Sequence, residues 1–131
     1  MKQVTEKYKD QLKFVYRHFP LDQHTHASEA ANVAEAAGVQ GKFWEMHDKL
    51  FENQTNLSQD VYIKLAKDLN LDSEKFTKAL TENSYKDKIQ RDANDGVVIG
   101  VSATPTFFLN GKKLNLFAFS DLENEIKKAL Q

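Results

Sequence analysis

The stretch "SATPTFFLNG", residues 102–111, determines the fold expected for the C-terminal third of the chain. An apolar run at 106–109 follows Thr104-Pro105, and a proline at the entrance of a strand removes one backbone donor. Asn110-Gly111 then supplies the dipeptide most typical of a two-residue hairpin turn. The alternating pattern returns over residues 112–116. We therefore predict a β-hairpin whose first strand begins at the Thr104-Pro105 bond.

The sequence before this hairpin predicts one strand and a series of helices. Residues 2–11 have the composition of the end of a helix. Residues 13–19 are rich in aromatic and β-branched side chains, which predicts a short strand that Pro20 stops. Apolar side chains at helical spacing then predict about five helices between residues 25 and 98.

Serine residues mark the expected beginnings of several helices. Ser58 precedes an apolar pattern at helical spacing, as an N-cap residue does, and Asn83 or Ser84 is expected to start a later helix. Ser120 and Glu123 have the spacing of a capping box, which predicts the start of the last helix. Capping therefore explains these serines better than a nucleophilic role. The whole order predicts one α/β domain, residues 1–131, with a helical insertion at about 25–98.

Composition excludes several classes of function. The net charge is −1, which gives no electrostatic reason to expect a nucleic acid or an anionic membrane as a partner. The longest apolar runs are far shorter than the roughly 20 residues that a membrane helix needs. The chain has no cysteine, so it offers no disulfide, no thiolate metal site and no thiol nucleophile. No cofactor is expected.

Four stretches occur in a characteristic order: "KFVYRHFPL" at 13–21, "HASEAANVAEAAG" at 26–38, "GKFWEMHDKLFENQ" at 41–54 and "GVSATPTFFLNGKKL" at 100–114. Together they resemble the bacterial-type DsbA-like thiol-disulfide oxidoreductases of the thioredoxin superfamily. The resemblance covers nearly the whole chain. It implies an incomplete thioredoxin-like core that carries the all-helical insertion, and a cis peptide bond before Pro105.

The same resemblance implies where a substrate would bind. In that family the backbone of the residue before the cis proline faces the active site and pairs with an extended or unfolded polypeptide. Thr104 and Pro105 are therefore the expected substrate-binding residues. The resemblance also implies an extracytoplasmic location.

The family's C-x-x-C motif and its first core strand would lie before Met1, so this cysteine-free chain should be inactive in thiol-disulfide exchange. Whether the reaction would be oxidation, reduction or isomerisation stays open. The alternative is a non-catalytic module that binds peptides at the Thr104-Pro105 edge or associates with itself. Without the central strand, two strand edges would face a gap, and unpaired edges invite pairing with another copy. The two edges could close together, a second copy could fill the gap, or the chain could fold poorly. A helical interaction domain unrelated to thioredoxin would require a trans Thr104-Pro105 bond and no hairpin at 106–116.

Histidines and acidic side chains give weaker signals. His18, His24 and His26 could suggest a metal site, but no cysteine or carboxylate pattern completes a ligand set, so we expect a polar loop and no metal. His47 lies on the apolar face of its predicted helix and is expected to be a hydrogen-bonded core or interface histidine rather than a catalytic base, because no nucleophile can be assigned to it. One predicted helix face carries acidic residues that we expect to be solvated: Glu45, Asp48 and Glu52.

Aromatic side chains are concentrated in residues 43–51. Phe43, Trp44, Met46 and Phe51 could line a peptide groove between the helical insertion and the thioredoxin-like core. Alternatively these residues simply pack the insertion against the core, which is what we expect for Phe43 and Met46.

Overall fold

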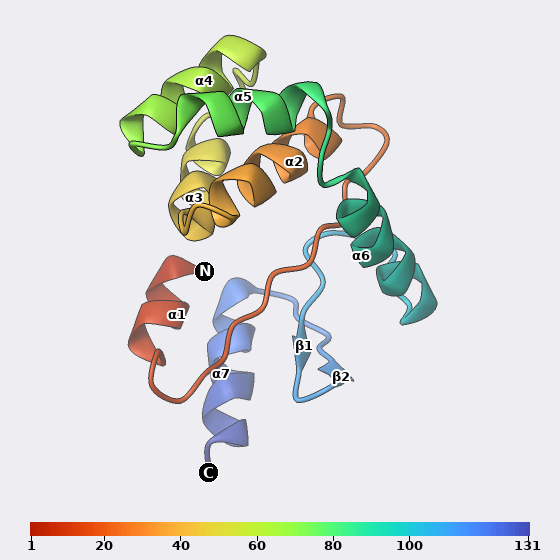
Figure 1. The fold of residues 1–131 in the computed structure, drawn as a ribbon. Helices are drawn as coiled ribbons and strands as arrows, with labels where there is room; N and C mark the ends of the chain where they lie inside the picture. The colour runs from red at the N-terminus through yellow and green to blue at the C-terminus, as the bar shows by residue number, and fades with distance from the viewer. The chain divides into compact units, whose positions relative to one another are not determined.

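The computed structural model describes residues 1–131, which form seven helices and one small sheet (Figure 1). The elements, in chain order, are α1 (Lys2–Lys7), α2 (Ala27–Gly38), α3 (Phe43–Glu52), α4 (Gln59–Asp68), α5 (Ser73–Thr81), α6 (Lys86–Val98), β1 (Phe108–Leu109), β2 (Lys112–Lys113) and α7 (Phe119–Ala129). They belong to two compact units. Unit 1 contains residues 1–16 and 100–131, and unit 2 contains residues 17–99.

Unit 2 is a cluster of five helices with α2 in contact with three of the others. Helix α2 packs against α3, α5 and α6, and α4 packs against α3 and α5. Six of the twelve residues of α2 are alanine, and these small side chains let neighbouring helices approach closely. The largest fully buried side chains are Phe76, Met46 and Val33. These residues form the centre of an apolar core that also contains Leu50, Tyr62, Leu65 and Leu71.

Two helix starts in unit 2 are capped by side chains, and the Ser58 cap is as predicted from the sequence. The Ser58 hydroxyl accepts the Val61 N–H at 3.3 Å, and the Asp72 carboxylate accepts the Lys75 N–H at 2.9 Å. Each bond satisfies a backbone donor that the helix itself leaves without a partner.

A buried asparagine connects α2 to the turn between α5 and α6. Asn32 is 3% exposed, and its amide nitrogen donates to the Ala79 carbonyl at 3.2 Å. Its amide oxygen accepts the Tyr85 N–H at 3.0 Å. Because buried polar groups are costly without partners, these two bonds fix how the turn lies against α2.

Unit 1 consists of α1, the β1–β2 hairpin and α7. Its core is small: Val4 and Tyr8 from α1 and its C-cap meet Leu122 and Ile126 from α7, and apolar residues of the hairpin pack beside them. Glu123 joins the two helices by accepting hydrogen bonds from Lys7 Nζ at 2.5 Å and Tyr8 Oη at 3.1 Å. Polar contacts therefore supplement a thin apolar core in this unit.

The hairpin forms where the sequence predicts it. β1 and β2 are antiparallel, with Phe108 opposite Lys113 and Leu109 opposite Lys112. Asn110 and Gly111 both have positive φ, 48° and 79°, as the two central residues of a type I′ turn do.

Three sequence predictions about local structure are wrong. Residues 13–19 form no strand, because no neighbouring strand supplies their backbone hydrogen bonds. Helix α7 begins at Phe119 rather than after Ser120, and the Asp121 carboxylate accepts the N–H groups of Phe117 and Ala118 at 2.9 Å each. Ser84 is not an N-cap either, since α6 begins after Tyr85.

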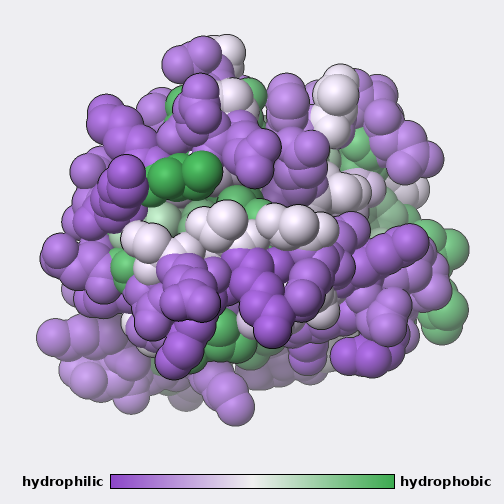
Figure 2. Space-filling model, turned by 45° about the horizontal axis from the view of Figure 1, so that its top comes forward, coloured by the Kyte–Doolittle hydropathy of each residue, from purple (hydrophilic) through white to green (hydrophobic).

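Polar side chains cover most of the face shown in the space-filling view, and apolar side chains are visible there as small separate groups (Figure 2). None of the helices combines the length and the apolar character needed to cross a membrane.

Candidate functional site

The segment from Gly100 to β1 contains the predicted binding residues. The Thr104-Pro105 peptide bond is cis, as the family resemblance implies. Ser102, Ala103, Thr104 and Pro105 are all exposed. The alternative of an unrelated helical domain required a trans bond at Thr104-Pro105 and the absence of a hairpin. The cis bond and the observed hairpin therefore exclude it.

Side-chain and backbone bonds fix this loop on both sides of the proline. Thr106 Oγ1 donates to the Ala103 carbonyl at 2.6 Å, which closes a turn around Thr104 and Pro105. Beyond the turn, Phe107 packs against the unit 1 core and its carbonyl accepts the Leu114 N–H at 2.8 Å. The loop is therefore held at its base while its tip faces solvent.

The backbone of Thr104 makes no hydrogen bond within the protein. Its N–H and C=O lie in an exposed residue, and Pro105 contributes no N–H of its own. Backbone groups that are exposed and lack an internal partner are those that an extended peptide can pair with. Thr104 therefore presents one backbone donor and one backbone acceptor without an internal partner at the surface.

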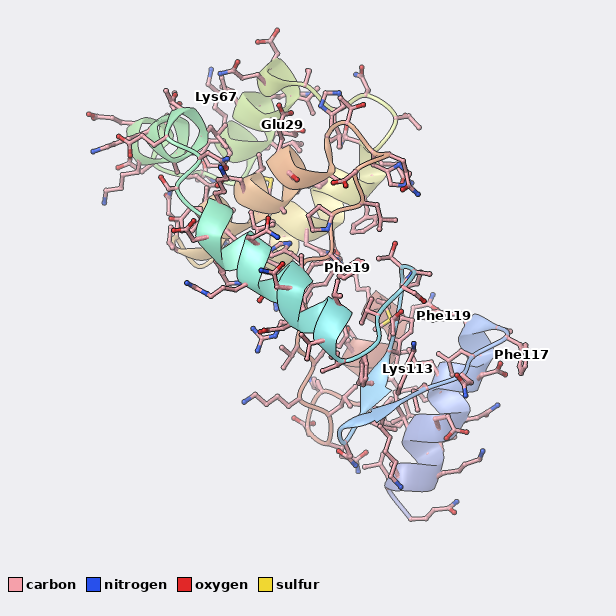
Figure 3. All side chains as sticks on the ribbon, turned by 90° about the vertical axis from the view of Figure 1, so that its right-hand side faces the viewer. Phe19, Glu29, Lys67, Lys113, Phe117 and Phe119 are labelled. Atoms are coloured by element: carbon pink, nitrogen blue, oxygen red, sulfur yellow. The ribbon has the colours of Figure 1, made fainter.

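A lysine lies at the start of the same loop. Lys113 Nζ donates to the Gly100 carbonyl at 2.6 Å, which brings an ammonium group from β2 to the residue where the loop begins. Figure 3 labels Lys113 on the hairpin, and it shows Phe117 projecting away from the adjacent backbone. Phe117 is fully exposed and Phe119 is half exposed.

Unit 2 contains a buried ionic network that the sequence did not reveal. His18, 4% exposed, donates from Nε2 to Glu35 Oε1 at 2.8 Å, and its backbone N–H donates to Asp92 Oδ2 at 3.2 Å. Lys88 Nζ lies 2.8 Å from Glu35 Oε1 and 3.1 Å from Asp92 Oδ2. Arg17 also approaches Asp92, at 3.5 Å. The network attaches residues 17–18 to both α2 and α6.

Burial and charge shift the pKa values of this network in opposite directions. Burial lowers the pKa of His18 below 6.5, although the hydrogen bond and the charge of Glu35 oppose the shift. Burial would also lower the pKa of Lys88, but hydrogen bonds to Glu35 and Asp92 outweigh it and raise the pKa above 10.5. Near neutral pH the network therefore holds a neutral imidazole beside a charged ammonium.

The histidines predicted to lie in a polar loop do not converge. His26 Nδ1 contacts Glu29 Oε2 at 3.0 Å, whereas His18 is buried in the ionic network. His24 is exposed. No group of three or more histidine, cysteine, aspartate or glutamate side chains could hold a metal ion.

The aromatic side chains of α3 contact one another in sequence. Phe43 and Trp44 meet edge to face with ring centroids 5.1 Å apart, and His47 lies 5.4 Å from Trp44 and 4.9 Å from Phe51. Met46 is fully buried in the apolar core of unit 2. Trp44 and Phe51 are 42% and 55% exposed, so the groove interpretation and the packing interpretation both stay predictions.

The buried Tyr62 hydroxyl in unit 2 lies near the Glu29 carboxylate. Tyr62 is 3% exposed, and its hydroxyl oxygen makes no hydrogen bond of regular geometry. Burial, followed by the negative charge of Glu29 and a hydrogen-bond interaction with it, raises the pKa of Tyr62 to about 12. A phenol with so high a pKa stays protonated near neutral pH, so it is a poor nucleophile.

The hairpin preceded by a cis proline agrees with the thioredoxin class that the sequence resembles. A family model described as "Thioredoxin" matches residues 1–128, and the chain therefore belongs to that family. No solved structure matches the chain.

Several curated relatives share about two fifths of their aligned residues with this chain. It is 41% identical over 103 residues to a protein of Salinispora tropica named Na(+)/H(+) antiporter NhaA 3, a match that covers 78% of this chain and 16% of that protein. It is 39% identical over 105 residues to the Na(+)/H(+) antiporter NhaA of Herminiimonas arsenicoxydans, covering 80% and 17% respectively. The chain spans about a sixth of the length of these relatives.

Proposed function

We propose that this chain is a DsbA-like thioredoxin-family domain that binds extended polypeptides at the Thr104-Pro105 edge. The observation that carries the proposal is the exposed backbone of Thr104, whose N–H and C=O make no hydrogen bond within the protein. A strand-like peptide can supply both missing partners. The turn around the proline, fixed by Thr106 and Phe107, keeps these groups at the surface.

The proposed role is binding without redox chemistry by the chain's own residues. Thiol-disulfide exchange proceeds by attack of a thiolate on a disulfide sulfur, and the 131 residues include no cysteine. Any oxidation, reduction or isomerisation of a bound substrate would need thiols from outside these residues. The chain's contribution to such a reaction would be to present the substrate backbone.

A peptide titration followed by NMR tests the proposal. An unfolded peptide is added to the isotope-labelled chain, and the amide signals of Thr104 and Phe107 are followed. Both signals should shift in a saturable manner, while the signal of Leu65, in the core of unit 2, should stay in place. Absence of shifts at Thr104 and Phe107 at millimolar peptide would overturn the proposal. A parallel assay with a disulfide substrate should show no thiol-dependent turnover.

Self-association is a second candidate, supported by the outer edges of the hairpin. β1 and β2 pair only with each other, so each strand has one edge without a ladder. A second copy could pair with either edge. Sedimentation at increasing protein concentration should then show a dimer, and a constant monomer mass up to millimolar concentration would eliminate this candidate.

The names of the relatives support a third candidate, in which the domain serves an Na(+)/H(+) antiporter. The aligned region can be removed from the Salinispora tropica relative, and Na⁺-driven proton movement can then be measured in vesicles. A change in rate or in sodium dependence would support this role, and identical transport with and without the region would argue against it.

A further inference from the structure

We propose that the Thr104 edge selects acidic extended polypeptides. This inference rests on the proposed function and adds to it the charge of the substrate. It is based on the position of Lys113, on the distribution of acidic residues along the chain, and on the partners that those acidic residues already have.

Lys113 places a positive charge at one end of the binding loop. Its ammonium group lies 2.6 Å from the Gly100 carbonyl, four residues before Thr104. An extended chain advances at most about 3.6 Å per residue, so these four residues span no more than about 14 Å. An acidic side chain within about four positions of the substrate residue that pairs with Thr104 can therefore approach the Lys113 ammonium.

No acidic residue competes for this charge within the loop or the hairpin. Residues 99–120 contain neither aspartate nor glutamate, and their two charged residues are Lys112 and Lys113. Lys112 is exposed and forms no ion pair. Two adjacent lysines of β2 thus carry charge that no acidic side chain of this segment neutralises.

The acidic residues that follow the loop already have partners. Asp121 accepts two backbone N–H groups at the start of α7, and these bonds lower its pKa. Glu123 accepts hydrogen bonds from Lys7 and Tyr8 and pairs with Lys127 at 3.1 Å, and Glu125 pairs with Lys128 at 2.6 Å. The carboxylates of α7 are therefore occupied.

The two units differ in charge although the chain as a whole is nearly neutral. Unit 1 contains eight lysines and five acidic residues, a net charge of +3. Unit 2 contains the other ten basic and fourteen acidic residues, a net charge of −4, and the two values give the total of −1. The charge of unit 1 complements an acidic peptide. The small total charge of the chain conceals this feature.

Three peptides of one length and one apolar pattern test the inference. They carry glutamate, glutamine or lysine at the same flanking positions, and their affinity is read from the Thr104 amide shift at low salt. An exposed ion pair changes affinity by about two- to fivefold, so the acidic peptide should bind that much more tightly than the neutral one. The difference should shrink at high salt, because screening weakens exposed pairs.

Lysine variants assign the preference to β2. Lys112→Gln, which breaks no contact, and Lys113→Gln should each reduce the preference for the acidic peptide. Lys113→Arg should retain it, because the charge stays. Lys67→Gln on α4 (Figure 3) makes the same change of charge in unit 2 and should leave the preference unaltered. Equal binding of all three peptides to the unaltered chain, or an equal loss with Lys67→Gln, would overturn the inference.

Two outcomes separate this inference from the proposed function. If the three peptides shift Thr104 with equal affinity, peptide binding stands and charge selection fails. If no peptide shifts Thr104, both fail. Competition with inorganic polyphosphate gives a further test. If polyphosphate displaces the acidic peptide from the lysines while the Thr104 amide shift stays unchanged, the lysines form a general anion site. That result would overturn the selection of acidic polypeptides.

Discussion

Replacement of Asn32 by alanine should destabilise unit 2 by about 2 kcal/mol. The partly buried Tyr85 N–H would lose its acceptor, at a cost of about 1–2 kcal/mol, which is less than a fully buried orphaned donor can cost. The Ala79 carbonyl would lose the Asn32 amide but keep the Ser84 N–H at 3.1 Å, so that loss is smaller, about 1 kcal/mol. Alanine favours the helix over asparagine by roughly 0.5 kcal/mol, which offsets part of the total.

Urea unfolding followed by tryptophan fluorescence measures this change, because the single tryptophan, Trp44, lies in unit 2. The midpoint should fall while the slope stays constant, since the surface exposed on unfolding is unchanged. Asn94→Ala on α6 is the matched control: Asn94 is exposed, and its loss should change the free energy of unfolding by less than about 0.5 kcal/mol. If Asn32→Ala destabilises no more than Asn94→Ala, the Tyr85 N–H is satisfied in another way and the reasoning is wrong.

Four further changes test the packing and the charges. Phe76→Ala should lower the free energy of unfolding by about 3–5 kcal/mol in the same urea assay, because a 1% exposed ring is removed from the core. Ser58→Ala should cost about 1 kcal/mol through loss of the N-cap. The pKa of His18 is lower in the folded chain than the usual 6.5, so the unfolded chain binds more protons than the folded chain as the pH falls below that value. The free energy of unfolding should therefore decrease on acidification. His18→Gln should remove this contribution from the dependence of stability on pH. Hydrogen bonds from Lys7, Lys127 and Tyr8 lower the pKa of Glu123 from 4.5 to about 2, so unit 1 should lose stability as the pH falls through that interval. The intensity of the native α7 amide signals should decline over the same pH range. In the Glu123→Gln variant this decline with falling pH should be less steep.

The features that the sequence predicted correctly depend on neighbouring residues. The Asn110-Gly111 turn is specified by two residues that tolerate positive φ, and the Ser58 cap by a hydroxyl three residues before its donor. The cis bond at Pro105 came from the family resemblance rather than from local chemistry. The role of Thr104 and Pro105 in binding stays a prediction.

The features that the sequence missed depend on residues far apart in the chain. Residues 13–19 have the composition of a strand, but a strand also needs a partner, and composition does not report one. The ionic network joins His18 to Glu35 and Asp92, which are 17 and 74 residues away. No spacing rule links such positions. The position of His18 within the aromatic-rich segment 13–19 was the one local hint that it would be buried.

The insertion of unit 2 between the two halves of unit 1 has a consequence for the order of assembly. Lys7 and Glu123 are separated by 116 residues, and closing so long a flexible loop carries an entropic penalty. In folded unit 2, the His18 N–H bonds to Asp92 near the opposite end of the same insertion, which holds its entry and exit segments together. The halves of unit 1 then need to close only a short effective loop. Unit 1 should therefore form after unit 2 and exchange its amide hydrogens faster, so that the proposed peptide-binding surface is the last part of the chain to assemble and the first to open.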